Sequence, residues 1–191
     1  QGTTGTCGGT GYVWQMTLRY AFYGDDFTGS TDVLEQLAEG GVKSVLFLRP
    51  PGSDLRARFP DVEAIGLAGD SRSRSPQWMD ENLPAVFEVL SGAEVVHYKI
   101  CSTFDSSPRT GSIGRALEIG IKRFGAPVAI VVCAPHVGRY VAFGNLFARA
   151  GDSVYRIDRH PTMSRHPVTP MHEADLVRHL AGQTGLGIGL V

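Results

Sequence analysis

Three polar clusters follow directly after apolar runs that are typical of β-strands. They are 25-DDFTG-29, 70-DSR-72 and 99-KICSTFD-105. In an open parallel sheet, ligands bind beyond the carboxyl ends of the strands. The three clusters are therefore expected to meet in one crevice, provided that the strands before them are neighbours in the sheet.

The side chains of these clusters fit a small polyhydroxylated acid better than an apolar ligand. Arg72 and Lys99 offer positive charge and N–H donors to a carboxylate or phosphate. Asp25, Asp26 and Asp105 can accept hydrogen bonds from hydroxyls, and one of them could act as a general base. Short hydroxyl side chains that could add contacts stand at Thr28, Ser102 and Thr103.

Asp25 and Asp26 stand where a strand gives way to a helix, so either one could serve as the helix cap. One cap is enough for a helix start, and successive side chains of an extended chain point to opposite sides. We therefore expect one aspartate to cap the helix and the other to face the crevice, with Asp26 as the first candidate for substrate contact and Asp25 as the second. Arg72 has a simpler alternative as well, because the run 71-SRSRS-75 is also typical of a solvated loop.

The clusters are carried by alternating strand and helix patterns. Strands are predicted at 18–24, 43–48, 63–69, 95–100 and 128–134, and the last of these is apolar enough to be buried on both faces. A helix is predicted after residue 29 up to Gly40-Gly41. Further helices are predicted from Ser75-Pro76, with a kink or a break at Pro84, over 113–124, and from Thr169-Pro170 to about Ala181. Short strands and turns are expected over 135–161, and a strand at 186–191.

This order of elements predicts an α/β fold: an open, mainly parallel sheet with helices on both faces, of the Rossmann or flavodoxin-like kind. The length of 191 residues suits a single domain. Residues 1–15 are mostly Gly and Thr without a clear period, so they are interpreted as an upstream extension before a domain at 16–191. No secretory signal or bilayer-length apolar run is visible, which indicates a cytoplasmic protein without a membrane partner.

The formal net charge of −1 argues against a nucleic-acid partner recruited by bulk charge. Cys7, Cys101 and Cys133 lie far apart and indicate reduced thiols, with Cys101 interpreted as a packing residue rather than a nucleophile. The histidines of 159-RHPTMSRHPVTPMH-172 match no common ligand spacing, so no metal site is predicted. The prolines of this segment suggest a rigid wall over the crevice.

Four stretches together resemble the N-terminal domain of the four-carbon acid sugar kinases. They are GDDFTGSTD, KICSTFDSSPRTGSIGRALE, APHVGRYVAFGNLFA and YRIDRHPTMSRHPVTPMHEADL, in the family's order and within residues 17–191. The forms CSTFDSS and HPTMSRHPVTPM are most similar to the 3-oxo-tetronate kinase branch, which has threonate and erythronate kinases as relatives. By motif, the resemblance implies substrate-binding roles for Asp25, Asp26, Thr28, Ser71, Arg72, Lys99, Ser102, Thr103, Asp105 and Arg139.

The resemblance implies ATP-dependent transfer of phosphate to the 4-hydroxyl of a four-carbon sugar acid. In such kinases a C-terminal domain supplies the nucleotide site, so ATP and Mg²⁺ are expected to be held mainly outside this chain. Residues 16–191 alone are then expected to bind the sugar acid and to turn over little, with homo-oligomerisation left open. The alternatives are a stand-alone metabolite-binding module without catalysis and, more weakly, a phosphohydrolase that uses the aspartate pair as Mg²⁺ ligands.

Overall fold

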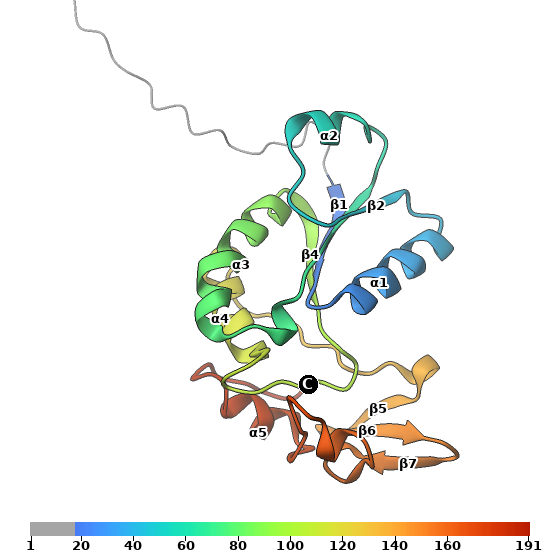
Figure 1. Ribbon diagram of the computed structural model, residues 1–191, viewed down its shortest axis with the longest axis vertical. Helices are drawn as coiled ribbons and strands as arrows, with labels where there is room; N and C mark the ends of the chain where they lie inside the picture. Colours follow the sequence, from blue (N-terminus) through green and yellow to red (C-terminus); the bar gives the residue numbers. More distant parts are fainter. Residues whose placement is uncertain (1–17) are drawn as a thin grey trace, which may run out of the picture.

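The computed structural model describes residues 18–191, so the predicted extension at 1–15 lies outside the described residues. Two β-sheets organise this part of the chain, a parallel sheet of four strands and an antiparallel sheet of three. The antiparallel sheet lies beyond the carboxyl ends of the parallel strands (Figure 1). The predicted α/β fold with a mainly parallel sheet is confirmed.

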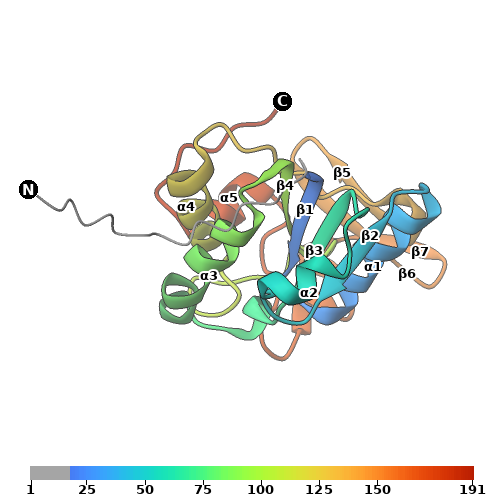
Figure 2. The same ribbon diagram turned by 90° about the horizontal axis from the view of Figure 1, so that it is seen from above.

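The parallel sheet has the strand order β2-β3-β1-β4. Its strands are β1 (Leu18–Gly24), β2 (Ser44–Phe47), β3 (Ala64–Ala68) and β4 (Ala93–Lys99). Within it, Gly24 pairs with Ala68 of β3 on one side and with Lys99 of β4 on the other. The strands that precede the three polar clusters are therefore neighbours, with their ends in register (Figure 2).

Helices cover both faces of this sheet, as predicted. One face carries α1 (Phe27–Glu39), and the other carries α3 (Pro76–Leu90) and α4 (Ile113–Phe124), while the short α2 (Ser53–Ala57) lies near the amino ends of the strands (Figure 1). Leu83 and Phe87 of α3 pack with Tyr23 and Ile65 in the first hydrophobic core. Among the described residues no helix is long and apolar enough to cross a bilayer.

A second core lies under the antiparallel sheet, whose strands are β5 (Arg139–Ala142), β6 (Asn145–Ala150) and β7 (Ser153–Arg156). Leu146 of β6 packs there with Phe104, Met171 and Leu180. The remaining elements are α5 (Leu176–Ala181) and four 3₁₀ turns, η1 (Ser71–Ser73), η2 (Pro135–Val137), η3 (Ile157–Arg159) and η4 (Met163–Arg165). The short strands and turns expected over 135–161 are thus present.

The predicted buried strand at 128–134 is wrong. This segment has no strand pairing beyond an isolated bridge from Ala134 to Arg139, and Val131 is 81% exposed. Its apolar character serves another purpose, because Val132 and Ile130 pack into the second core instead of against the parallel sheet. Consequently β4 is an edge strand of the parallel sheet.

Two smaller predictions also fail, together with part of a third. Of the kink or break expected at Pro84, the break is absent, because α3 is one element that continues through Pro84 and the residues around it are anchored in the first core. Helix α5 begins at Leu176 because Asp175 caps it, accepting from two backbone N–H groups, whereas Thr169 is used elsewhere. Residues 186–191 form no strand.

Candidate functional site

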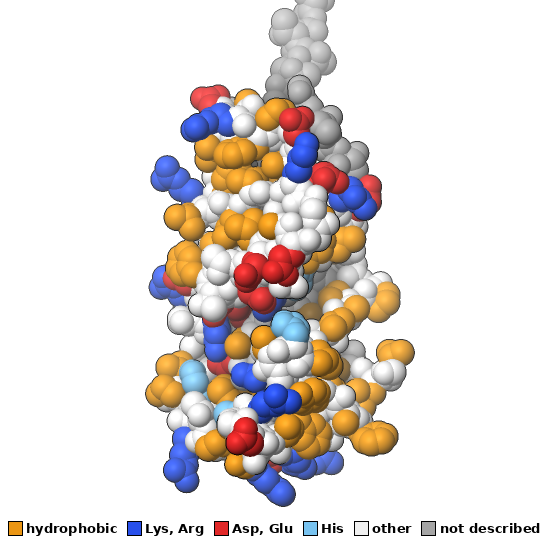
Figure 3. Space-filling view, turned by 90° about the vertical axis from the view of Figure 1, so that its right-hand side faces the viewer, with side chains coloured by type: hydrophobic (Ala, Val, Ile, Leu, Met, Phe, Trp, Pro, Cys, Tyr) orange, Lys and Arg blue, Asp and Glu red, His pale blue; other side chains and the backbone are white. Residues whose placement is uncertain are grey.

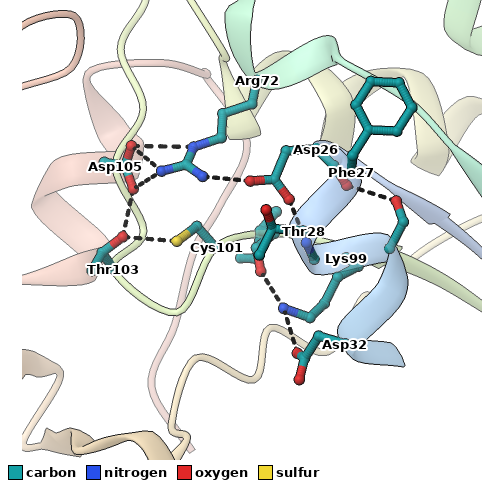
Figure 4. Close-up of polar contacts among 12 residues, drawn as sticks. Asp26, Phe27, Thr28, Asp32, Arg72, Lys99, Cys101, Thr103 and Asp105 are labelled. Atoms are coloured by element: carbon teal, nitrogen blue, oxygen red, sulfur yellow. Dashed lines mark hydrogen bonds and ion pairs between the residues drawn. The ribbon is translucent and has the colours of Figure 1, made fainter. Parts of the chain in front are cut away.

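The carboxyl ends of β1, β3 and β4 bring the three polar clusters together, as the sequence predicts. Arg72, in the turn after β3, donates from Nη1 to Asp26 Oδ2 at 2.7 Å, and Asp26 follows β1. The same guanidinium donates from Nη2 to both carboxylate oxygens of Asp105 at 2.9 and 2.8 Å (Figure 4). Arg72 therefore joins residues that follow three neighbouring strands.

Asp105 is the most enclosed member of this arrangement, with a fully buried side chain. Besides Arg72, it accepts hydrogen bonds from the hydroxyls of Thr103 and Thr169, the latter at 3.1 Å. Thr103 is buried too, and its hydroxyl also lies beside the Cys101 sulfur. Asp105 and Thr103 therefore hold Arg72 in place rather than face a ligand.

The loop that carries Asp105 packs against the 3₁₀ turn η1 at Gly111. This glycine has a φ of +60°, and a Cβ there would lie 2.4 Å from the Arg72 carbonyl oxygen. Its N–H donates to the carbonyl of Arg74 at 2.9 Å. A side chain at this position would thus push the loop away from the residue that it helps to fix.

The expected division between the two aspartates is wrong in one respect, because Asp26 carries both tasks. Its Oδ1 accepts from the Gly29 N–H at 2.6 Å and so caps α1, while its Oδ2 binds Arg72. Asp25 does not face the crevice as a free carboxylate. It is 5% exposed, and among the described residues no donor reaches its Oδ1.

Burial of the Asp25 carboxyl is the main cause that raises its pKa, and the neighbouring negative charge of Asp26 acts in the same direction, while the positive charge of Arg72 opposes the rise. Together these causes raise the pKa of Asp25 from 3.8 to about 7. Asp25 is consequently poised to change protonation near neutral pH, directly beneath the Arg72 cluster.

Lys99, the last residue of β4, lies on the other side of Asp26. Its Nζ is 3.3 Å from Asp32 Oδ2 and donates to the Ile100 carbonyl at 3.1 Å (Figure 4). The Lys99 side chain is 19% exposed and the Asp32 side chain 44% exposed. The carboxylate of this pair is more open than the fully buried Asp105, whereas the two cations are enclosed to a similar degree, with 19% of the Lys99 side chain and 23% of the Arg72 side chain exposed. Both cations line the groove described next, so an anionic ligand could reach either of them.

A groove of about 1350 Å³ runs from this site along the open edge of β4. The predicted site residues that line it are Asp26, Thr28, Arg72, Lys99, Ser102 and Arg139. Its other walls are formed by α4 and the segment 127–134. On the face seen in Figure 3, acidic side chains gather over α1 and apolar side chains gather below them.

Four predicted residues lie away from the groove lining. Asp25, Thr103 and Asp105 are buried beneath it, and the Ser71 hydroxyl is tied to Tyr98 Oη at 2.8 Å with the residue fully buried. Arg139 lines the groove, but its Nη1 already donates to the Val137 carbonyl at 2.7 Å. The ten predicted residues thus divide into groove-lining groups and groups that support them.

Two residues of the site, Asp32 and Thr169, were not predicted, because the sequence around each of them gave little or no indication of a role in the site. Asp32 is one turn inside α1, where an acid is an ordinary surface residue. Thr169 lies 64 residues from Asp105 and was interpreted as a helix start. The proline-containing segment does pack against the site through Thr169, while His160 and His166 accept backbone N–H groups of their own turns.

A family model described as "Sugar-binding N-terminal domain" matches residues 20–191. A 3-oxo-isoapionate kinase of Paraburkholderia graminis is 53% identical over 189 residues, which are 97% of this chain and 40% of that protein. A 3-oxo-tetronate kinase of Pseudomonas fluorescens is 34% identical over 87% of this chain and 38% of its own length.

A solved structure also shows the same fold as this chain. A Haemophilus influenzae protein from a family of unknown function superposes with a TM-score of 0.71 at 28% identity. The match covers 86% of this chain and 39% of that one. The chain therefore spans about two fifths of the length of the relatives that it matches.

Proposed function

From the premise that the chain belongs to the family of sugar-binding N-terminal domains of four-carbon acid sugar kinases, we propose that it binds the sugar acid in such a kinase. The reaction would transfer phosphate from ATP to the 4-hydroxyl of the sugar acid. The relatives named above are kinases of 3-oxo-isoapionate and 3-oxo-tetronate. A 3-oxo sugar acid is therefore the substrate class to test first, with threonate and erythronate next.

The observation that carries this proposal is the meeting of Asp26, Arg72 and Lys99 at one end of the groove. Lys99 and Arg72 line the groove and supply positive charge for the carboxylate of the substrate. Asp26 can accept hydrogen bonds from the substrate hydroxyls, and the hydroxyls of Thr28 and Ser102 can donate or accept them. The buried Asp105 keeps Arg72 in place, and phosphoryl transfer depends mainly on such positioning.

We propose that ATP and Mg²⁺ are held mainly by a C-terminal domain outside this chain. The described residues contain no group of three or more His, Cys, Asp or Glu side chains that could hold a metal ion. Asp25 is 5% exposed and lies outside the groove lining, so the aspartate pair presents only Asp26 to the groove. The site therefore does not fit the alternative of a phosphohydrolase with Mg²⁺ on the aspartate pair.

Binding of the sugar acid is testable on this chain directly. Isothermal titration with 3-oxo-isoapionate, 3-oxo-tetronate, threonate and erythronate should give saturable binding by at least one of them. A ligand at a hundred times its Kd should stabilise the fold by about 3 kcal/mol. Lys99→Met should weaken binding, whereas Lys43→Met, which removes an equal charge at an exposed site before β2, should not. No binding of any of these acids at millimolar concentration would overturn the proposal.

A complementation assay distinguishes the proposed kinase function from the alternative of a stand-alone metabolite-binding module. The purified chain is mixed with the C-terminal part of the Paraburkholderia relative, ATP, Mg²⁺ and 3-oxo-tetronate. Phosphorylated acid that forms only when both parts are present supports the kinase. Tight sugar-acid binding without phosphorylation, also after the two parts are fused in one chain, supports the module instead.

A further inference from the structure

Asp25 has a fixed position beneath the proposed sugar-acid site. Its N–H donates to the Lys99 carbonyl at 3.0 Å, and its carbonyl accepts from the Arg72 N–H at 3.0 Å. These two bonds tie it to the two residues that carry the positive charge of the site. The carboxyl group is buried with them, since the residue is only 5% exposed.

The Asp25 carboxyl lacks the partners that a buried carboxylate needs. Among the residues that the structure describes, none donates to its Oδ1. Arg72 cannot compensate fully, because its guanidinium already binds Asp26 and Asp105. Lys99 likewise pairs with Asp32. An unpaired buried charge is costly, so the carboxyl responds by holding a proton.

Asp25 is surrounded by charged and titratable side chains, which come from the elements packed against it. They are Asp26, Arg72, Lys99, Asp105 and Tyr98. Two of these are carboxylates, which disfavour a third negative charge, and two are cations, which favour it. The balance leaves the pKa of Asp25 at about 7, so ionised and neutral forms coexist near neutral pH.

An anionic substrate changes this balance, and here the inference rests on the proposed function. A bound sugar acid brings one more carboxylate to Arg72 and Lys99. If Asp25 is ionised, the new anion and Asp25 compete for the same two cations. If Asp25 is neutral, the ligand is the only new anion that the positive charges of Arg72 and Lys99 have to stabilise. Anion binding and proton binding at Asp25 must therefore favour one another.

We propose that Asp25 is a positioning residue for substrate binding, which takes up a proton when an anionic sugar acid occupies the groove. It acts through Arg72 and Lys99 and does not touch the substrate, because it lies outside the groove lining. The site would then bind its anion most tightly on the acid side of neutrality. An asparagine in place of Asp25 would mimic the protonated form permanently.

The experiment is calorimetric titration of the chain with threonate or 3-oxo-tetronate from about pH 6 to about pH 9. The carboxyl of such an acid titrates near pH 3.5, so it stays ionised throughout. Affinity should fall by up to about tenfold per pH unit above pH 7. Repeating the titration in buffers of different ionisation enthalpy should show uptake of up to about one proton per ligand.

Asp25→Asn should keep the affinity measured at low pH and lose both the pH dependence and the proton uptake. Asp70→Asn is the matched control, because Asp70 is a nearby acid whose exposed carboxylate pairs with Arg74; it should keep the original profile. Two results would overturn the inference about Asp25 while leaving the proposed function intact. One is an affinity of the unaltered chain that stays constant across this pH range. The other is an affinity of Asp25→Asn that changes with pH as steeply as that of the unaltered chain. Absence of binding at every pH would overturn the proposed function as well.

Discussion

The two ion pairs of the site differ in what surrounds them. Asp105 is fully buried, and its oxygens are occupied by Arg72, Thr103 and Thr169. Asp32 lies beside the groove, and its side chain is 44% exposed. Both cations line the groove and are enclosed to a similar degree. The difference therefore lies in the carboxylates: Asp105 fixes the position of Arg72, whereas the exposed Asp32 can give up Lys99 to a ligand.

The largest effect on stability is expected from Asp105→Ala. Removal of this carboxylate leaves Arg72 without its main partner in a partly enclosed place, and breaking a buried pair costs about 3–5 kcal/mol. Urea denaturation would measure the loss. Asp70→Ala breaks the exposed pair with Arg74 and should cost less than about 1 kcal/mol. Equal losses in the two variants would contradict the distinction between an enclosed and an open pair.

The next effect concerns Asp25 and the pH dependence of stability. Because the pKa of Asp25 is about 7 in the folded chain and near 3.8 when unfolded, the folded state binds more protons between these values. Stability should therefore fall as pH rises from about 4 to about 7, by up to about 1.4 kcal/mol per unit and about 4 kcal/mol in total.

Asp25→Asn should lack this contribution, so it should be more stable than the unaltered chain at about pH 8. The measurement is the free energy of unfolding of both proteins across the pH range. Curves that stay parallel from about pH 4 to about pH 8 would show that Asp25 does not hold the extra proton.

A moderate effect is expected from Thr169→Val. This change keeps the shape of the side chain and removes the hydrogen bond to the Asp105 carboxylate together with the contact to His166 Nδ1, for a loss of about 2 kcal/mol. Thr31→Val, in an exposed position on α1, should stay within about 0.5 kcal/mol of the unaltered chain. Thermal unfolding of both variants measures the difference. A loss no larger than that of Thr31→Val would separate the proline-containing segment from the site.

Lys99→Met is expected to have the smallest effect on stability and the largest effect on the affinity for the sugar acid. Its pair with Asp32 is open to solvent, so the change should cost less than about 1 kcal/mol. The loss of a charged donor should weaken sugar-acid binding by about 10- to 100-fold, measured by calorimetry. A variant that binds normally but unfolds easily would place Lys99 with Asp105 among the supporting residues.

The sequence predicted the parallel sheet and the meeting of the three clusters, because strand patterns and the ends of strands are local features. It also identified the family, and the match over residues 20–191 confirms that identification. It ranked Asp26 before Asp25 for the crevice, but it assigned the helix cap to the other aspartate, since nothing in the sequence shows that one carboxylate can use its two oxygens for both tasks. It also could not predict that Ile130 and Val132 pack into the second core, because an apolar run does not reveal its partner.

The two oxygens of Asp26 have a consequence for folding. One oxygen completes the first turn of α1 within three residues, whereas the other meets Arg72 across 46 residues of chain. Arg72 in turn meets Asp105 across 33 residues. Closing a longer loop costs more chain entropy, and contacts between residues far apart in the sequence slow folding. The helix cap therefore adds a local contact at a low entropic cost, whereas the arginine cluster adds nonlocal contacts to the folding reaction.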